Sequence, residues 1–315
     1  MTNRKSTEKN DEKNVNDTNN KFEYPSFLLC PPTMYSERIP NNIWMKNLTD
    51  EQRAPDYKVA MEQFIDLYKV LASKSLLYLL PSPDDVPLQD LVFTANLGIV
   101  LSHLPNRKVA IVSNFTSEPR RGETEFGLKF FNTLGYETFV PETKFEGEAD
   151  LKYLYDNIYV GGYGMRSELE TYKWMEKMFD MKIICLKMGD EYLYHLDCTV
   201  FPLTRSKVLV CTSLYSDEEL KNLETFAEII AIDYESALSG ICNSVRVGNV
   251  IFNSNNFKLF EPDTKDFNNE VLKNRCLEKI AADNGLEVEF MELDEYTKSG
   301  ALLSCMVLHM NRNNY

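Results

Sequence analysis

The sequence has little histidine, no closely spaced cysteine pair and no long apolar run. Its seven cysteines are an odd number, and none of them forms a C-x-x-C pair. This scatter predicts reduced thiols and argues against a disulfide-stabilised secreted fold. The N-terminus lacks an apolar segment of the secretory kind, and no apolar run is long enough to cross a bilayer. We therefore expect a cytoplasmic protein or one of another reducing compartment.

Basic residues are also fewer than acidic residues. The chain has 34 Lys and Arg against 48 Asp and Glu, which gives a formal net charge of -14 and a pI of about 4.8. A nucleic acid or an anionic membrane would be repelled by this field, so we expect neither as a partner. The charge agrees with a cationic small-molecule substrate, although acidic surfaces more often serve solubility. A homo-oligomer stays open.

Length and composition favour one catalytic domain with a short tail. At 315 residues and 43% hydrophobic content, the chain can bury a large core. Residues 1–21 are almost entirely polar, with Val15 as the one interior apolar residue. Such a segment cannot bury enough surface to offset the cost of ordering. We therefore expect a disordered tail over residues 1–21 and one catalytic domain over residues 22–315.

Hydrophobic spacing predicts an α/β fold. Between Tyr57 and Leu71, apolar residues recur at intervals of three and four, which indicates an amphipathic helix. Further helices are expected at 123–134, 168–179, 216–226 and 268–282, the last two capped by Ser216 and by residues 266–268. Short strands are expected between them, with Gly248 and Asn249 forming a hairpin turn. Their ranges are 27–30, 91–100, 108–113, 137–141, 158–160, 182–187, 207–211, 229–232, 246–252, 287–289 and 305–310.

His195 is one of only three histidines, and Asp197 lies two positions beyond it. On a strand, alternation would place both side chains on the same face. A neighbouring carboxylate orients an imidazole and tunes it for general acid and base work. A buried hydrogen-bonded pair is the commoner explanation of such a segment taken alone.

Two loops hold the remaining candidates for catalysis. Residues 144–150 contain three acids around Gly147, and no second histidine lies near enough for a familiar metal site. We therefore expect no metal. This loop fits cation binding or histidine orientation, and equally a solvated acidic loop. Cys305 follows the glycine-bearing segment 298–304, where a nucleophile would be exposed yet rigidly placed, although free cysteines are usually buried filler. We also expect no cofactor, because residues 161–164 lack the third glycine of a dinucleotide-binding loop.

In this order the segments resemble the pentein superfamily of guanidino-group-modifying enzymes. That superfamily comprises arginine deiminases, dimethylarginine dimethylaminohydrolases, arginine amidinotransferases and arginine dihydrolases. The likeness runs from about Phe27 to Leu308. The segments that carry it are Cys30-Pro31-Pro32, Asn42-Ile43-Trp44-Met45, Thr94-Ala95-Asn96-Leu97-Gly98, Arg121-Gly122-Glu123, Phe145-Glu146-Gly147, Gly162-Tyr163-Gly164-Met165-Arg166-Ser167-Glu168, His195-Leu196-Asp197 and the Cys305 segment.

The resemblance implies an α/β-propeller of five ββαβ-type modules around a central polar channel. It also implies attack of a cysteine thiolate on a guanidinium carbon, through a covalent thiouronium that water releases. The roles that it implies are Cys305 as nucleophile, His195 as acid and base, Glu146 as the carboxylate that orients His195, Asp197 as a guanidinium clamp, and Arg166 as ligand of the substrate α-carboxylate, with Arg121 and Asn42 as further candidates for that end.

Asn96 departs from the deiminase pattern, in which a second aspartate usually stands. An amide can donate a hydrogen bond to a neutral ureido carbonyl, whereas an aspartate only accepts. Arginine dihydrolases share this asparagine, so the resemblance favours arginine dihydrolase, which converts arginine to ornithine, ammonia and CO2. Glu148, where relatives carry a small residue, either adds negative charge or points outward. Open alternatives are a deiminase or dimethylarginine hydrolase giving citrulline, an amidinotransferase, and a non-catalytic pentein that only binds.

Overall fold

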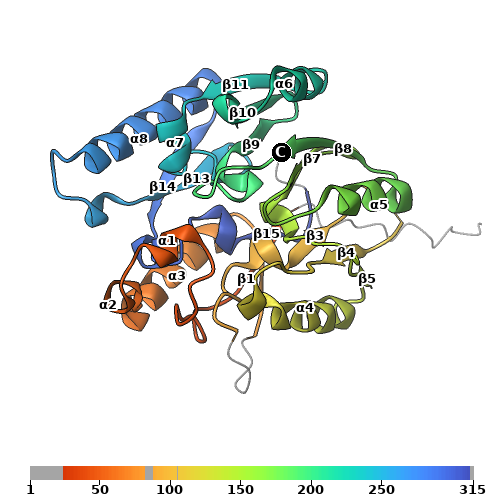
Figure 1. Cartoon of the computed structure of the whole chain (residues 1–315), viewed down its shortest axis with the longest axis horizontal. Helices are drawn as coiled ribbons and strands as arrows, with labels where there is room; N and C mark the ends of the chain where they lie inside the picture. The colour runs from red at the N-terminus through yellow and green to blue at the C-terminus, as the bar shows by residue number, and fades with distance from the viewer. Residues whose placement is uncertain (1–23, 82–87, 105, 313–315) are drawn as a thin grey trace, which may run out of the picture.

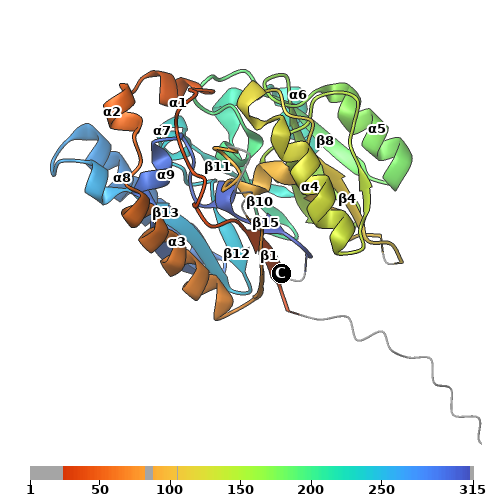
Figure 2. The same cartoon turned by 90° about the horizontal axis from the view of Figure 1, so that it is seen from below.

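The computed structural model describes residues 24–81, 88–104 and 106–312. These residues form five three-stranded sheets, set around a common centre with the helices outside (Figure 1). In a second view at right angles, the long helices α3 (Tyr57–Ala72), α4 (Gly122–Thr133), α5 (Leu169–Phe179) and α8 (Lys265–Asp283) again lie at the periphery (Figure 2). The tail expected over residues 1–21 lies outside the described residues. No described helix combines the length and the apolar content that a membrane span requires.

Every sheet has the same topology. Its first two strands pair antiparallel, and a helix then carries the chain over to a third strand, which pairs parallel with the second. Four modules follow one another along the chain: β3 (Gly98–Val100), β4 (Val109–Val112), α4 (Gly122–Thr133) and β5 (Glu137–Phe139); β6 (Leu151–Tyr155), β7 (Ile158–Tyr163), α5 (Leu169–Phe179) and β8 (Lys182–Lys187); β9 (Val200–Thr204), β10 (Lys207–Cys211), α6 (Asp217–Glu224) and β11 (Glu228–Ile232); β12 (Val245–Val247), β13 (Val250–Asn255), α8 (Lys265–Asp283) and β14 (Glu287–Glu292).

The fifth module joins the two ends of the described chain. Its sheet has the order β15 (Leu308–His309), β1 (Ser26–Leu29) and β2 (Leu76–Leu79), and α3 (Tyr57–Ala72) connects the last two. Leu308 pairs with Leu28 across the antiparallel edge. This pairing closes the ring, so the predicted architecture of five ββαβ-type modules is confirmed.

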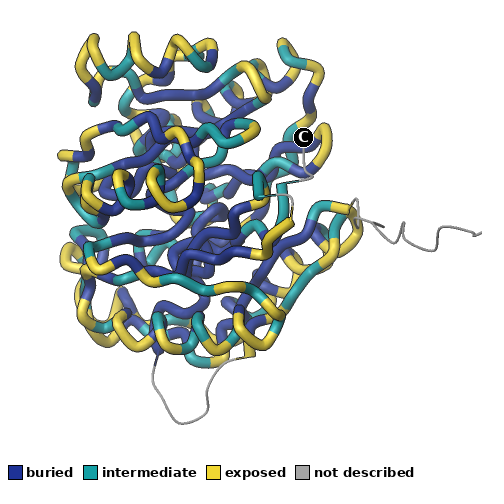
Figure 3. Tube along the Cα trace, turned by 90° about the vertical axis from the view of Figure 1, so that its right-hand side faces the viewer, coloured by how far each residue is buried: buried dark blue, intermediate teal, exposed yellow. Residues whose placement is uncertain are grey.

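The sheets bury both faces. In β4, Val109 and Ile111 pack towards β6, β7 and α5, whereas Ala110 and Val112 pack towards β1 and α4. All four side chains are fully buried, which explains why this strand is a continuous apolar run instead of an alternating one. Figure 3 shows the same pattern throughout: buried inner segments, with exposed positions on the outer helices and loops.

The long helices form where the spacing predicted them. In α3, the buried residues Ala60, Phe64, Leu67 and Leu71 recur at intervals of three and four, and the Asp56 carboxylate caps the N-terminus. Helices α4, α5 and α6 also lie where expected, and the hairpin between β12 and β13 is confirmed. All seven cysteines lie in the described residues, and none of them forms a disulfide there, as the scatter of their positions predicted.

Several boundaries differ from the prediction. Helix α8 begins at Lys265 and is capped by Thr264, because the Thr264 hydroxyl accepts from the Phe267 backbone, so the cap expected at residues 266–268 is wrong. Of the strand expected over residues 91–100, only β3 is extended. Strands β2, β6 and β9 were not expected. The remaining short helices are α1 (Ile43–Lys46), α2 (Asp50–Arg53), α7 (Tyr234–Leu238) and α9 (Asp294–Thr297).

Candidate active site

A short turn precedes the first strand of each module, and the site is built from these turns. Four of them are single 3-10 helices, η1 (Thr94–Leu97), η3 (Gly147–Ala149), η4 (Leu196–Cys198) and η7 (Ser304–Met306), and the fifth is the loop 240–244 before β12. Each turn presents one buried polar side chain or thiol near the centre of the ring: Asn96, Glu146, His195, Asn243 and Cys305. Residues up to 209 positions apart, from Asn96 to Cys305, are thereby brought together.

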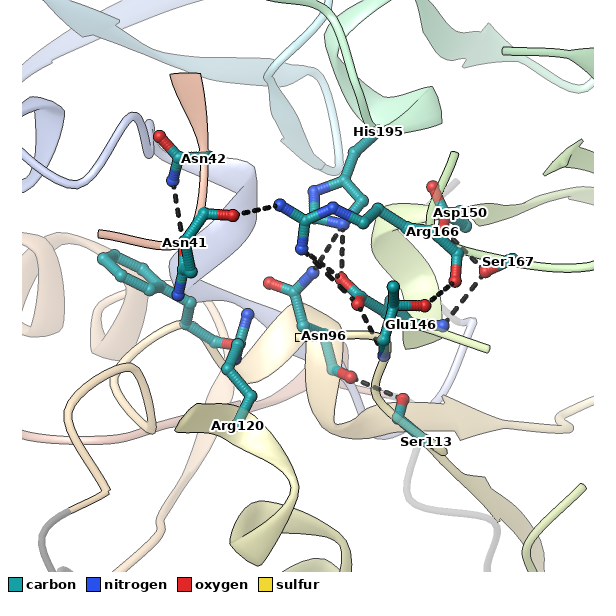
Figure 4. Close-up of polar contacts among 12 residues, drawn as sticks. Asn41, Asn42, Asn96, Ser113, Arg120, Glu146, Asp150, Arg166, Ser167 and His195 are labelled. Carbon is teal, nitrogen blue, oxygen red and sulfur yellow. Dashed lines mark hydrogen bonds and ion pairs between the residues drawn. The ribbon is translucent and has the colours of Figure 1, made fainter. Parts of the chain in front are cut away.

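His195 and Glu146 form a buried pair. The imidazole Nε2 lies 2.8 Å from Oε2 of Glu146, and Arg166 donates to the same oxygen at 3.2 Å (Figure 4). The backbone N–H of Thr116 donates to the other oxygen. Burial would raise the pKa of Glu146, but Arg166 and His195 outweigh it and lower that pKa to about 2. Glu146 is therefore an ionised carboxylate that fixes the orientation of the ring.

Asp150 fastens the turns that carry this pair. Its Oδ1 accepts the Leu196 backbone N–H at 3.2 Å, and its Oδ2 accepts the Ser167 hydroxyl at 2.6 Å. The Ser167 oxygen in turn accepts the backbone N–H of Glu146. Burial raises the pKa of Asp150 to about 6, with the nearby Glu146 charge acting in the same direction. Asp150 thus links η3 to η4 beneath the reactive groups.

Cys305 lies against Asp197 at the inner end of η7. Its sulfur is 3.8 Å from Oδ2 of Asp197, which also accepts the Ser304 hydroxyl at 2.7 Å. Lys152 reaches within 4.0 Å of the same carboxylate oxygen. Burial, reinforced by the Asp197 charge, raises the pKa of the Cys305 thiol to about 12. The group is therefore a neutral thiol near pH 7.

Cys305 and His195 line one pocket, whose empty volume of about 330 Å³ includes space open to solvent. The sulfur is thus reachable, although the cysteine is only 8% exposed. Most of the lining residues have polar side chains, which suits a charged and hydrogen-bonding ligand. The complete lining is Asn41, Asn42, Asp90, Phe93, Asn96, Arg120, Arg166, Tyr194, His195, Ser299, Ala301 and Cys305.

A cationic and an anionic group also line this pocket. The guanidinium of Arg166 lies 4.6 Å from the centroid of the Tyr194 ring and donates to the carbonyl of Asn41. Asp90 accepts the Asn41 amide at 2.7 Å, and burial raises the pKa of this carboxyl group. Figure 4 shows Arg166 between Asn41 and Glu146, with Asn96 below His195. The Asn96 amide nitrogen is 3.4 Å from the His195 Nε2 atom.

Two of the expected ligand-binding residues are placed differently. Arg121 is exposed and does not line the pocket, whereas its neighbour Arg120 does. The two arginines lie at the end of a 3-10 turn, in which one position rotates a side chain by about 120°, so the arginine that lines the pocket is the one next to the expected residue. Asn42 lines the pocket, but its amide caps α1 through the Met45 N–H and donates to the Ser299 carbonyl.

His195 does not lie on a strand, so the alternation considered for His195 and Asp197 does not apply. His195 and Asp197 flank the turn η4, so they do not share a strand face. His195 faces the pocket, whereas Asp197 is fully buried beside Ser304 and Cys305. Similarly, Cys305 sits in η7 and not at the start of a strand. Glu148 does not point outward, because it is buried against His309 and Arg312.

Asn243 is a residue of the site that sequence reasoning missed. Its side chain contacts the Cys305 sulfur and accepts the backbone N–H of Ser304. Its position could have revealed it, because Asn243 lies just before the first strand of a module, as the site residues of the other four turns do. Among the described residues, no group of three or more His, Cys, Asp or Glu side chains could hold a metal ion.

No family model matches the chain. The bifunctional arginine dihydrolase/ornithine cyclodeaminase AgrE of Nostoc is 28% identical over 291 residues, which are 90% of this chain but only 37% of that protein. The N-terminal domain of the cyanobacterial arginine dihydrolase ArgZ, solved with product, is 25% identical with a TM-score of 0.78 over 92% of this chain and 98% of that domain. A dimethylarginine dimethylaminohydrolase structure, at 19% identity and a TM-score of 0.65, covers 91% of this chain and 99% of its own.

The last of these likenesses bears on the fold alone, and the first two extend over nearly the whole described ring. The order of the motifs, the five closed modules and these relatives agree with one another. The chain has the α/β-propeller fold of the pentein enzymes that it resembles.

Proposed function

We propose that the chain is a cysteine hydrolase that acts on the guanidinium carbon of arginine, and that it is an arginine dihydrolase. The observation that carries the proposal is one polar pocket lined by Cys305, His195 and Asn96, with Glu146 paired to His195 behind it. The names of AgrE and ArgZ, both arginine dihydrolases, support the same activity. Because the chain covers 37% of either protein, no second activity is transferred.

Substrate binding follows from the charges around the pocket. A guanidinium is a planar cation, so the buried carboxylates Asp197 and Glu146 would hold it beside the sulfur. Arg166 offers a forked donor for the α-carboxylate at the other end. Asp90 would accept the α-ammonium group, whose positive charge would counteract the burial that raises the pKa of this carboxyl group.

The chemistry then takes two steps. The Cys305 thiolate forms a bond to the guanidinium carbon, and one nitrogen leaves as ammonia after it receives a proton from His195, leaving a covalent thiouronium. His195 next removes a proton from water, which adds to the same carbon and expels the thiolate. The product of this round is citrulline.

Asn96 would allow a second round on the same sulfur. The ureido group of citrulline is neutral, and the Asn96 amide can donate to its carbonyl, which an aspartate cannot do. Cys305 expels a second ammonia, and water releases a carbamate that breaks down to ornithine and CO2. Two waters are consumed for two ammonia molecules and one CO2.

Product analysis tests the proposal. The protein is incubated separately with arginine, citrulline and dimethylarginine, and the products are identified by mass spectrometry. Ornithine from the first two is expected, with loss of activity by roughly a thousandfold in Cys305→Ser and little change in Cys276→Ser, which lies on α8 away from the pocket. Citrulline as the sole end product would exclude the dihydrolase and leave the deiminase. Turnover that requires an added amine would indicate an amidinotransferase, and no turnover a binding protein.

Asn96→Asp tests the second round separately. We expect arginine consumption to continue while citrulline accumulates, because the new carboxylate can hold the cation but cannot donate to the ureido carbonyl. The ratio of citrulline to ornithine should rise at least about tenfold. Equal ornithine yield from the variant and the wild type would remove Asn96 from the second round.

The remaining expectations on partners and location are part of this proposal. We infer an amino acid as the substrate. We infer neither a nucleic acid nor a membrane as a partner, because the net charge of -14 would repel both. Seven cysteines that form no disulfide in the described residues favour the cytoplasm as the location.

A further inference from the structure

The side chain of Asn243 has one orientation that satisfies its surroundings. Its Oδ1 accepts the backbone N–H of Ser304 at 2.8 Å. A backbone N–H can only donate, so the atom that faces Ser304 is the amide oxygen and the other is the NH2 group. Of the two, the NH2 group lies nearer to the sulfur of Cys305: the Nδ2 to Sγ distance is 3.4 Å, and the Oδ1 to Sγ distance is 3.9 Å. The amide is therefore fixed as a donor to the sulfur.

The rest of Asn243 is also held in place. The residue is 1% exposed, and its backbone carbonyl accepts a long contact from the Asn253 amide at 3.5 Å. Asn253 donates as well to the Gly240 carbonyl and the Ser244 hydroxyl. Its own oxygen accepts from the buried ammonium of Lys273 at 3.0 Å. The loop 240–244 is thus anchored to α8, and a rigid amide is a better hydrogen-bond donor than a mobile one.

The electrostatic surroundings of the sulfur are otherwise unfavourable to a thiolate. Asp197 is its nearest charged neighbour, and burial removes the water that would solvate an anion. Among the side chains that the structure describes, Asn243 is the one that donates a hydrogen bond to this sulfur. A backbone hydrogen bond from Leu302 acts in the same direction. The titratable and charged groups around the sulfur are Asp197, Lys152, Cys198 and Tyr194, and across the pocket Asp90, Arg120, Arg166 and His195.

We propose that Asn243 is a further catalytic residue, whose amide donates a hydrogen bond to the Cys305 sulfur and stabilises it as the attacking and departing thiolate. The inference rests on the proposed function, since it assigns a role within the same reaction. The amide acts twice in each round: when the thiolate forms its bond to carbon, and when water displaces it. No proton leaves the amide, so the balance of the reaction is unchanged.

Two variants remove the donor in different ways. Asn243→Asp keeps an oxygen for the Ser304 N–H and turns an acceptor towards the sulfur, and Asn243→Leu removes the donor without adding charge. The rate of Cys305 alkylation by iodoacetamide is measured between about pH 7 and pH 10 by mass analysis of the Cys305 peptide, because only the thiolate reacts. Asn222→Asp makes the same chemical change at an exposed position of α6 and serves as the control.

We expect alkylation of Cys305 to become about tenfold slower at each pH in both variants, and the pH profile to move upward by about one unit. A purely structural role predicts the opposite direction. If the loop loosened and exposed the sulfur, the burial that raises the pKa of Cys305 would be relieved and alkylation would become faster. Unchanged or faster alkylation in either folded variant therefore overturns the proposal.

This assay is independent of turnover. Iodoacetamide alkylates Cys305 whether or not the chain hydrolyses arginine. Slower alkylation without arginine hydrolysis by the wild type would count against the proposed function alone. A variant that unfolds, as judged by circular dichroism, is replaced by the other, and Asn222→Asp must match the wild type.

Discussion

At the scale of single residues, the proposed nucleophile Cys305 is a neutral thiol. Burial and Asp197 raise the pKa of Cys305 to about 12, well above pH 7. A guanidinium held by Asp197 and Glu146 would place positive charge beside the sulfur and favour its ionisation. In this account the substrate itself activates the cysteine, which protects the thiol from other electrophiles between turnovers.

Glu37 gives a prediction of the pH dependence of stability. It is 4% exposed, its Oε1 accepts the hydroxyls of Tyr35 and Ser299, and its Oε2 is without a hydrogen-bond partner among the described residues. Burial raises the pKa of Glu37 from 4.5 to about 7. A raised pKa means that the contribution to stability is complete below pH 4.5 and is lost as the pH rises through about 7.

Glu37→Gln cannot ionise, so it should gain stability relative to the wild type as the pH rises. Thermal unfolding at about pH 5 and pH 8 measures the difference in Tm between the two proteins, which should become more favourable to the variant by roughly 2–4 °C. A difference that is the same at both pH values would show that Glu37 does not titrate in this range.

At the scale of elements, the predictable parts are the ones with a long pattern. Helix α3 spans four turns with a continuous apolar stripe, so its ends could be placed to within one residue. The turns η1, η3, η4 and η7 span only three or four residues each, too few to show a period. They are fixed by distant contacts, such as Asp150 with Ser167 and the Leu196 backbone. The spacing of apolar residues therefore could not identify Asn243 as a pocket residue or distinguish Arg120 from Arg121. Glu146, His195 and Cys305 were predicted from motifs that follow one another in the order of the resembled family.

Gly147 tests how closely these turns must approach one another. Its φ is 66°, and an added Cβ would collide with the Ala95 carbonyl oxygen and lie 2.8 Å from the carbonyl carbon of Asn96. We expect Gly147→Ala to lose about 1–2 kcal/mol of stability from the positive φ and at least about tenfold in kcat/KM, because η1 and η3 must separate.

Gly135→Ala is the matched control. Gly135 has a φ of 77°, but an added Cβ would meet nothing within 4 Å. The control should show a similar loss of stability in urea unfolding and retain activity. Equal activity in the two variants would mean that the spacing between Asn96 and Glu146 is not critical.

At the scale of the whole molecule, each of the five modules contributes one side chain to the candidate site. Cys305 precedes β15, the strand that closes the ring on β1, and Asn96, Glu146, His195 and Asn243 come from the other four modules. None of these turns could present a complete site alone. The family resemblance predicted this closed arrangement, while apolar spacing alone indicated only an α/β fold, because the pairing of β15 with β1 joins positions about 280 residues apart.

The central claim is that Cys305 becomes covalently bonded to the guanidinium carbon. Acid quenching during turnover of arginine, followed by mass analysis of the cysteine-containing peptides, tests it most directly. The account predicts a Cys305 peptide that is heavier by arginine less one ammonia, unmodified peptides for the other six cysteines, and no adduct in Cys305→Ser. Sustained turnover by that variant, or an adduct on a different cysteine, would contradict it.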